Sequence, residues 1–232
     1  MFSRKLTRSI VVGAAAIAVA GGSYGIVSAT SSSSSPPASS GSAGGLGSGG
    51  GGSNARSGPA AGGASGTVGS VSASSFTIST SAGQKVTVNE ASSTTYQKGA
   101  SSTSASAITT GEPVLVLGTT SGVTITAAQV IVQPAGGSAS SSAAKVIPFQ
   151  RGAPTTSKQA GQIPANYTQG SGTIVSGTAA NKATEAALAA YPGGVVDRVV
   201  KLSNGEYEVH YIGVNWPHHI FVDSAFKVVG AF

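Results

Sequence analysis

Cysteine is absent from the 232 residues of the chain, and charged residues make up only 9% of it. Without cysteine there are no disulfide bonds, no thiolate nucleophiles, no cysteine-bound zinc and no lipid anchor on a cysteine. Aromatic residues are also scarce, at 6%, and there is one tryptophan. Glycine, with 34 residues, and serine crowd into two stretches that offer little to bury, so the part of the chain that can fold is small.

The net charge of +6 comes mainly from segments that are not expected to fold. Three basic residues lie within the first eight, one at position 56, and three between positions 145 and 158. Residues 65–134 are neutral overall, and residues 173–232 carry a net charge of −1. Because a nucleic-acid-binding protein needs a basic face on a folded part, we expect no nucleic-acid partner.

The first 29 residues have the pattern of a secretory signal. A cationic start precedes an apolar run over 10–20, and a region of small residues ends in Val27-Ser28-Ala29. Cleavage after Ala29 is one interpretation, and an uncleaved membrane anchor over 10–29 is the other. Both place residues 30–232 outside the cytoplasm, secreted or tethered to the cell membrane, with membrane contact through the N-terminal segment alone.

Two segments have the composition of linkers. Apart from Leu46, Asn54 and Arg56, residues 31–64 are all Ser, Gly, Ala or Pro, which predicts a disordered linker over 30–64. Residues 134–172 predict a second, extended linker. Within it, the hydrophobic side chains at 146, 147 and 149 could dock on a neighbouring domain.

Residues 65–133 alternate between hydrophobic and polar side chains with a period of two, in short runs separated by turns. This pattern predicts a small antiparallel β-barrel or sandwich. The expected core residues are Val68, Val71, Phe76, Ile78, Val86, Val88, Val114, Val116, Ile125, Val130 and Val132.

The segments GTVGSVSASSFTIST, VTVNEASSTTY and ITTGEPVLVLG resemble a family of small secreted β-barrel domains of unknown function, somewhat like an oligonucleotide-binding fold in shape. The resemblance covers almost all of 65–133, and its motifs are patterns of strands and turns that carry no chemistry.

Residues 173–232 predict an α+β domain with one helix packed on an antiparallel sheet. Thr178 is the expected N-cap of a helix over 179–191, and Pro192-Gly193-Gly194 ends it. One apolar stripe of this helix is expected to face the sheet, namely Ala180, Ala183, Thr184, Ala187, Leu188 and Tyr191. The fold class is therefore mostly β, with a small barrel or sandwich, an α+β C-terminal domain and disordered linkers between them.

Asn204-Gly205 predicts a two-residue hairpin turn, which fixes the register of the strands beside it. On the core face, counting outward from the turn gives the pairs Leu202–Tyr207, Val200–Val209 and Arg198–Tyr211, with the Arg198 guanidinium over the Tyr211 ring. On the opposite face it gives Lys201–Glu208 and Val199–His210.

All three histidines and the tryptophan lie within residues 210–223. Alternation places Ile220 and Val222 inward and His219 outward, and His218 on the side opposite to His219. One solvated polar face is then expected to carry Glu206, Glu208, His210, His219 and Asp223. No nucleophile elbow, phosphate loop or helix-borne histidine pair accompanies these residues, so we expect no enzymatic activity, no cofactor and no metal site, with a weak surface metal site as an alternative.

The segments ATEAALAAYPGGVV, VVKLSNGEYEVHYI and HHIFVDSAFKVVGAF resemble a PepSY-type domain. The chain departs from that family at NWPHH, where Asp-Gly is common, and at SAFK, where Thr-Gly is common. The resemblance implies a bacterial extracytoplasmic protein that binds or restrains a partner, a peptidase being one candidate. It names no catalytic residue.

We therefore expect a non-enzymatic binding module at the bacterial cell envelope with a protein partner at the cell surface. Trp216, Tyr211, His218 and His219 are the expected contact residues, because Trp216 lies in a loop and loop tryptophans contact partners effectively. The alternative for Trp216 is a lid that packs back on the helix and sheet. The alternative for the whole protein is a structural spacer that spans the cell wall.

Overall fold

The structure is a computed structural model that describes residues 58–134, 146–152 and 158–232. The predicted leader and most of the first linker lie outside the described residues. Within the described residues, no helix is both long and apolar enough to cross a membrane. The elements are β1 (Ala60–Val71), β2 (Ser75–Ser79), β3 (Lys85–Lys98), β4 (Ser101–Thr103), a 3-10 turn η1 (Ala105–Ala107), β5 (Pro113–Ser121), β6 (Thr124–Val132), β7 (Ile147–Pro148), β8 (Ala160–Gly161), β9 (Thr173–Ile174), α1 (Gly177–Ala190), β10 (Val195–Lys201), β11 (Tyr207–Ile212), β12 (Val214–Trp216), β13 (His219–Val222) and β14 (Val228–Ala231).

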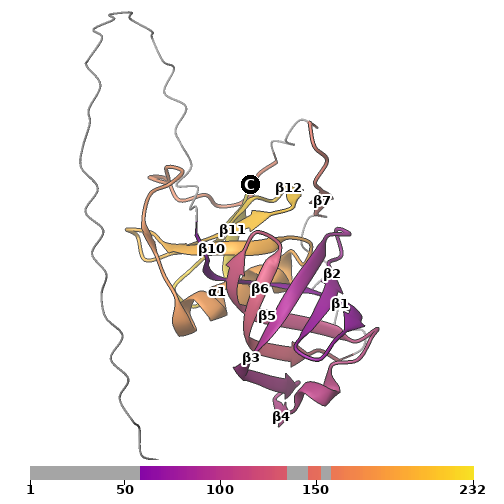
Figure 1. The fold of residues 1–232 in the computed structure, drawn as a ribbon. Coiled ribbons are helices and arrows are strands. Elements are labelled where there is room, and N and C mark those ends of the chain that lie inside the picture. Colours follow the sequence, from indigo (N-terminus) through magenta and orange to yellow (C-terminus); the bar gives the residue numbers. More distant parts are fainter. Residues whose placement is uncertain (1–57, 135–145, 153–157) are drawn as a thin grey trace, which may run out of the picture. The chain divides into compact units, whose positions relative to one another are not determined.

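Five strands close into a barrel (Figure 1). Their order is β2-β3-β6-β5-β1, and β2 also pairs with β1, so both edges of the sheet are joined. The expected antiparallel pairing is found everywhere in this barrel except between β3 and β6, which run parallel. All of the predicted core residues are buried except Val71. Val71 pairs with Phe76 at the last position of β1, and it remains 46% exposed.

Helix α1 packs on the sheet with the predicted stripe. Ala180, Ala183, Thr184, Ala187 and Leu188 are its buried residues, and the alanines let the helix axis approach the strands closely. The N-cap is Ser176 and not Thr178, because the helix already begins at Gly177. At the other end the Tyr211 hydroxyl donates to the Tyr191 carbonyl oxygen at 2.9 Å, which ties the helix C-terminus to β11.

The β10–β11 hairpin has a register that differs by one residue from the prediction. Lys201 pairs with Tyr207 and Val200 with Glu208, and the Leu202 N–H donates to Glu206 O, so the loop contains the three residues 203–205. A two-residue type I′ turn requires a positive φ at both Asn204 and Gly205, but of the two only Gly205 has one, at 88°. A shift by one residue moves the side chains of one strand to the other face. Arg198 therefore pairs with His210, and the predicted position over Tyr211 is wrong.

The barrel and the helix-bearing sheet are continuous within the described residues. β1 pairs with β10 at Gly63–Val196 and Ala64–Val195, and the sheet continues through β11, β13 and β14. Leu115 and Leu117 of β5 belong to the same hydrophobic core as the buried alanines of α1. The prediction of two separate domains is therefore not confirmed.

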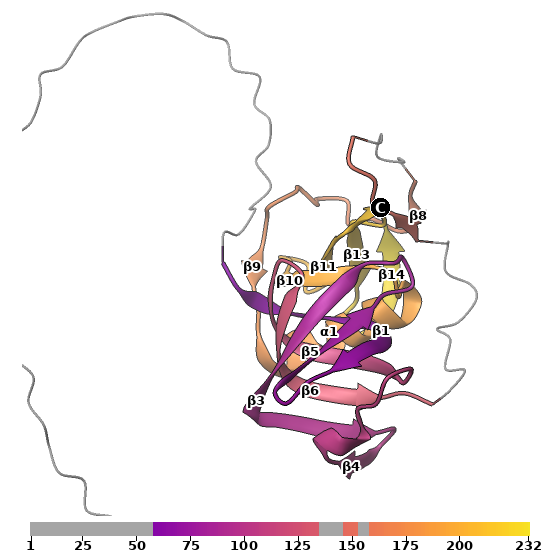
Figure 2. The ribbon, with the colours of Figure 1, turned by 45° about the vertical axis from the view of Figure 1, so that its right-hand side comes forward.

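The described residues of the predicted second linker include two short strands: β7 pairs with β12, and β8 pairs with β14. β9, at the start of the predicted C-terminal domain, pairs with β10. We name residues 158–174 the cover segment, since it is held to the sheet at both ends by β8 and β9 (Figure 2). Val146 and Ile147 pack against the core as predicted, whereas Phe149 is 55% exposed.

Candidate functional site

The face of the sheet that points away from helix α1 carries polar side chains, and these side chains are buried. Glu208 is 1% exposed, and Arg198 and His219 are each 4% exposed. The cover segment lies over them, and its Ile163 and Tyr167 pack with Phe221. The predicted solvated polar face is therefore wrong, although Glu208, His210 and His219 do lie on the face that alternation assigned to them.

Glu208 and His219 form a buried pair beneath the cover segment. His219 Nδ1 lies 2.5 Å from Glu208 Oε1, and the Tyr167 hydroxyl donates to the same oxygen at 2.9 Å. Burial alone would raise the pKa of Glu208, but the hydrogen bond and positive charge of His219 outweigh it and lower the pKa. Burial and the neighbouring Glu208 carboxylate raise the pKa of Tyr167 far above its usual value, so its hydroxyl stays protonated.

A β-bulge in β10 supplies the next part of the site. The register shifts between Val196 and Arg198, so Asp197 is the extra residue. Asp197 Oδ1 lies 2.6 Å from His210 Nδ1, and Arg198 donates to Asp197 Oδ2 at 3.2 Å. The guanidinium also lies 3.1 Å from His210 Nδ1. The shorter contact to the carboxylate makes Nδ1 of His210 a donor to Asp197.

His218 and His219 line the same pocket, which differs from the prediction that they point to opposite sides. Both backbone N–H groups donate to Phe232 O, at 2.9 and 3.0 Å, so two residues oppose one on the neighbouring strand, as in a β-bulge. His218 Nδ1 donates to Tyr211 O at 3.2 Å. Burial lowers the pKa of His218.

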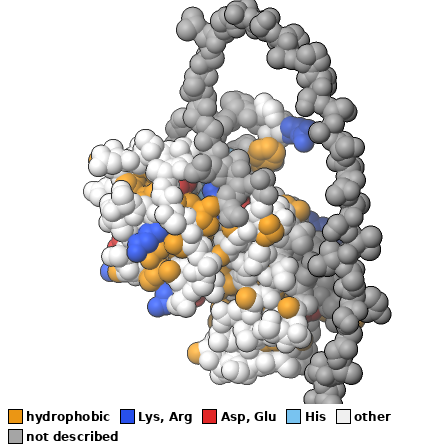
Figure 3. Space-filling view, turned by 60° about the vertical axis from the view of Figure 1, so that its left-hand side comes forward, with side chains coloured by type: hydrophobic (Ala, Val, Ile, Leu, Met, Phe, Trp, Pro, Cys, Tyr) orange, Lys and Arg blue, Asp and Glu red, His pale blue; other side chains and the backbone are white. Residues whose placement is uncertain are grey.

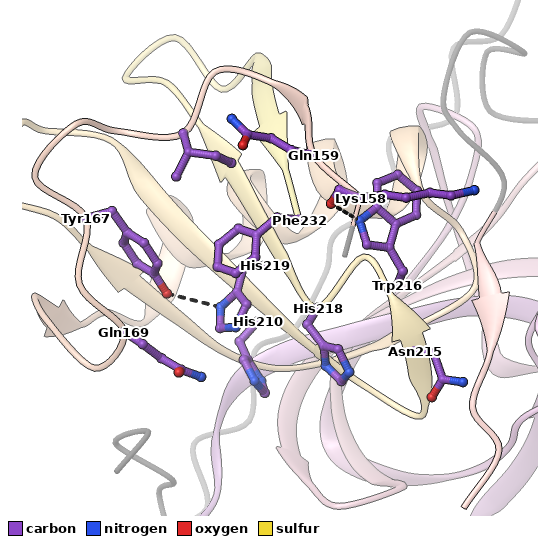
Figure 4. Close-up of a pocket in the computed structure, with 11 residues that line it drawn as sticks. Lys158, Gln159, Tyr167, Gln169, His210, Asn215, Trp216, His218, His219 and Phe232 are labelled. Atoms are coloured by element: carbon purple, nitrogen blue, oxygen red, sulfur yellow. Dashed lines mark hydrogen bonds between the residues drawn. The ribbon is translucent and has the colours of Figure 1, made fainter. Parts of the chain in front are cut away.

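The three imidazoles line one cavity of about 730 Å³, which we name the histidine pocket (Figure 4). Ring centroids lie 5.0 Å apart for His210 and His219, 6.2 Å for His210 and His218, and 6.4 Å for His218 and His219. In Figure 4 the hydroxyl of Tyr167 points to His219 from the cover segment. The other lining residues are Lys158, Gln159, Ile163, Gln169, Asn215, Trp216 and Phe232.

Trp216 is 1% exposed and packs back on the helix and sheet, which is the lid arrangement that the sequence left as an alternative. Its Nε1 donates to Lys158 O at 2.6 Å, and its ring meets that of Tyr191 edge to face. Tyr211 has no exposed surface. These two predicted contact residues therefore lie off the outer surface, and of the predicted four, Trp216, His218 and His219 line the histidine pocket.

Sequence patterns did not identify Asp197, Arg198 or Tyr167 as parts of this site. The two bulges interrupt the alternation, and the cover segment has no periodic pattern that would reveal which face it packs on. Asp223, which alternation groups with the histidines, instead accepts the N–H groups of Ala225 and Lys227 in a turn. Within the described ranges, no group of three or more His, Cys, Asp or Glu side chains has the spacing of a metal site.

Comparisons with known proteins do not assign the chain to a family. No family model matches it, and neither a curated protein nor a solved structure is significantly similar to it.

Proposed function

We propose that the protein is a non-enzymatic binding module that acts outside the cytoplasm and takes a segment of a protein partner into the histidine pocket. The observation that carries this proposal is the pocket itself. Its volume of about 730 Å³ falls within the range of roughly 300–1,000 Å³ that is usual for ligand sites. A peptidase that the module restrains is one partner of this kind, as the resemblance to PepSY-type domains implies.

The chemistry of the lining supports a polypeptide ligand. Ile163, Trp216 and Phe232 supply apolar surface to the lining, and the side-chain amides and Lys158 offer N–H donors. None of the described lining residues is a carboxylate. Donors beside apolar surface suit the carbonyl oxygens and hydrophobic side chains of a peptide segment.

The lining also favours binding over turnover. Among the described residues that line the pocket there is no serine, threonine or cysteine to serve as a nucleophile. The one hydroxyl group is that of Tyr167, and its raised pKa keeps it protonated. Nucleophilic catalysis requires an activated side chain beside a base. The Tyr167 hydroxyl already donates to Glu208, and the amine of Lys158 is exposed to solvent, whereas a nucleophilic lysine is activated by desolvation.

The face of the molecule drawn in Figure 3 gives little support for a nucleic-acid or membrane partner. The face in Figure 3 is mostly uncharged, with separate groups of hydrophobic side chains and a few Lys and Arg side chains between them. On this view the described residues form no continuous basic patch, which a nucleic-acid or anionic-membrane surface would require.

Site-specific photo-cross-linking on intact cells tests the proposal. The cross-linking residue replaces Gln169, which is exposed and lines the pocket. We expect one discrete adduct with a protein, which Gln159→Trp removes because its bulk fills the pocket mouth. Gln162→Trp is the matched control, since Gln162 is exposed on the same segment but does not line the pocket. An adduct that survives Gln159→Trp, or no adduct at all, contradicts the proposal and favours a structural spacer.

A further inference from the structure

The three histidines of the chain share one arrangement of hydrogen bonds, which burial of the rings alone does not require. Each Nδ1 donates to a fixed acceptor: Asp197 Oδ1 for His210, Tyr211 O for His218 and Glu208 Oε1 for His219. None of the hydrogen bonds of the described residues uses Nε2 of any of the three rings. When the rings are neutral, all three Nε2 lone pairs are therefore available on the walls of one pocket.

This arrangement is the one that proteins use to prepare histidine as a metal ligand. A ligating imidazole commonly donates its other N–H to a carboxylate or a backbone carbonyl, which fixes the tautomer, orients the ring and raises its basicity. Here two of the acceptors are carboxylates and the third is a carbonyl.

We propose that Nε2 of His210, His218 and His219 together bind a divalent transition-metal ion such as Zn²⁺ in the histidine pocket. This inference rests on the same pocket as the proposed function and names a ligand for it. Imidazole suits zinc, copper and nickel, and three histidines leave one tetrahedral position open toward the cavity. A group of the protein partner would occupy that fourth position.

The ring spacing defines what must move when the metal binds. Zn–N bonds of about 2.1 Å at tetrahedral angles place imidazole centroids about 5 Å apart. His210 and His219 already have a separation of 5.0 Å, whereas His218 lies 6.2 and 6.4 Å from them. As the side chains stand, no group of three or more His, Cys, Asp or Glu among the described residues could hold a metal ion, so the ring of His218 must shift by about 1 Å for the site to form. His218 lies just before β13 and is the partly exposed member of the adjacent pair, so its ring has room to shift into the cavity.

The charges around the pocket are compatible with a bound dication. Asp197 and Glu208 stand behind the imidazoles, and Arg198 is the buried cation that pairs with Asp197. Lys158 is the one lysine or arginine among the described residues that line the pocket, and its side chain is exposed to solvent. A metal ion held by the rings would interact favourably with both carboxylates.

Titration calorimetry with ZnCl₂ on the untagged full-length chain tests the proposal, because a histidine tag would itself bind metal. We expect a stoichiometric site whose affinity falls at least about tenfold in His218→Asn. Asparagine can keep the donor to Tyr211 O while removing Nε2. Gln162→Ala is the matched control, since Gln162 is exposed on the same cover segment but does not line the pocket, and we expect it to leave the affinity unchanged.

Nuclear magnetic resonance of the wild-type chain gives a second measurement that does not depend on a variant. The chain contains three histidines, so ring labelling gives three sets of signals, one for each imidazole, and all three sets should shift together when Zn²⁺ is added. Any of three results overturns the metal site: no heat of binding, an affinity that His218→Asn leaves unchanged, or a shift of the signals of one ring alone. If the metal site fails while Gln159→Trp still removes the cross-linked adduct, the proposed function stands. If Zn²⁺ binds and no adduct forms, the proposed function fails alone.

Discussion

At the scale of single residues, Glu208 shows how a polar strand position becomes part of a core. Its side chain is 1% exposed, and its oxygen Oε1 accepts from His219 and Tyr167. A charge in such a place is tolerated because it is paired and hydrogen-bonded, and loss of one partner leaves the other without compensation. Glu208 therefore stabilises the attachment of the cover segment as well as the strand.

The pH dependence of stability follows from the lowered pKa of Glu208. The folded-state pKa lies below the unfolded value of about 4.5, so the contribution of Glu208 is complete above that pH and is lost as the pH falls through the folded-state pKa. We expect Glu208→Gln to lower the free energy of unfolding by about 3 kcal/mol at neutral pH, and the difference from wild type to shrink on acidification. Denaturant unfolding at a series of pH values measures it, and a difference that is constant with pH contradicts the assignment.

The sequence predicted the side of the sheet for these residues but not their surroundings. Alternation along β11 correctly separates Tyr207 and Val209 from Glu208, since one face of a strand must meet the helix. The burial of Glu208 depends on Tyr167, which is 41 residues distant in a segment without periodicity. No local pattern encodes such a contact, so the polar face was expected in water.

At the scale of elements, the β10–β11 hairpin shows how one turn residue decides the content of a site. Asn204-Gly205 correctly indicated a hairpin, but the loop contains one more residue than the two-residue turn, because Asn204 does not take the positive φ that a type I′ turn requires at both central residues. The alternation of side chains in β10 and in β11 is compatible with both the predicted and the observed register of the hairpin. The position of Arg198 beside Asp197 and His210 follows from the observed register.

Substitution of Gly205 tests this turn. A Cβ at Gly205 would meet no atom within 4 Å, so only the backbone strain of its positive φ opposes a side chain. We expect Gly205→Ala to lower the free energy of unfolding by about 1 kcal/mol, and Gly205→Asn to cost less, because asparagine tolerates this conformation better. Denaturant unfolding followed by Trp216 fluorescence measures both. Equal costs for Ala and Asn would argue against a left-handed residue here.

At the scale of the described molecule, the contact between β1 and β10 joins what the sequence presented as two domains. Composition separates them clearly, since residues 134–172 look like a linker. The join depends on glycines and alanines in the first half of β1, a stretch whose low hydrophobicity resembles the linker before it. Close approach of two backbones requires small residues, and small residues are also what flexible linkers contain, so the sequence does not distinguish the two roles.

The shared sheet and core predict that residues 75–98 of the barrel and residues 207–222 of the histidine-bearing sheet unfold together. Hydrogen exchange measured by mass spectrometry along a denaturant series should give both peptides the same midpoint. Gly62→Val should lower both midpoints equally, because a Cβ at Gly62 would lie 2.1 Å from Val196 O and force β1 and β10 apart. Thr119→Val, an exposed and nearly isosteric change on β5, is the control and should move neither midpoint. If Gly62→Val left the midpoint of residues 75–98 unchanged while it lowered the midpoint of residues 207–222, the two halves would be independent domains. The order of the histidine pocket would then not depend on the barrel.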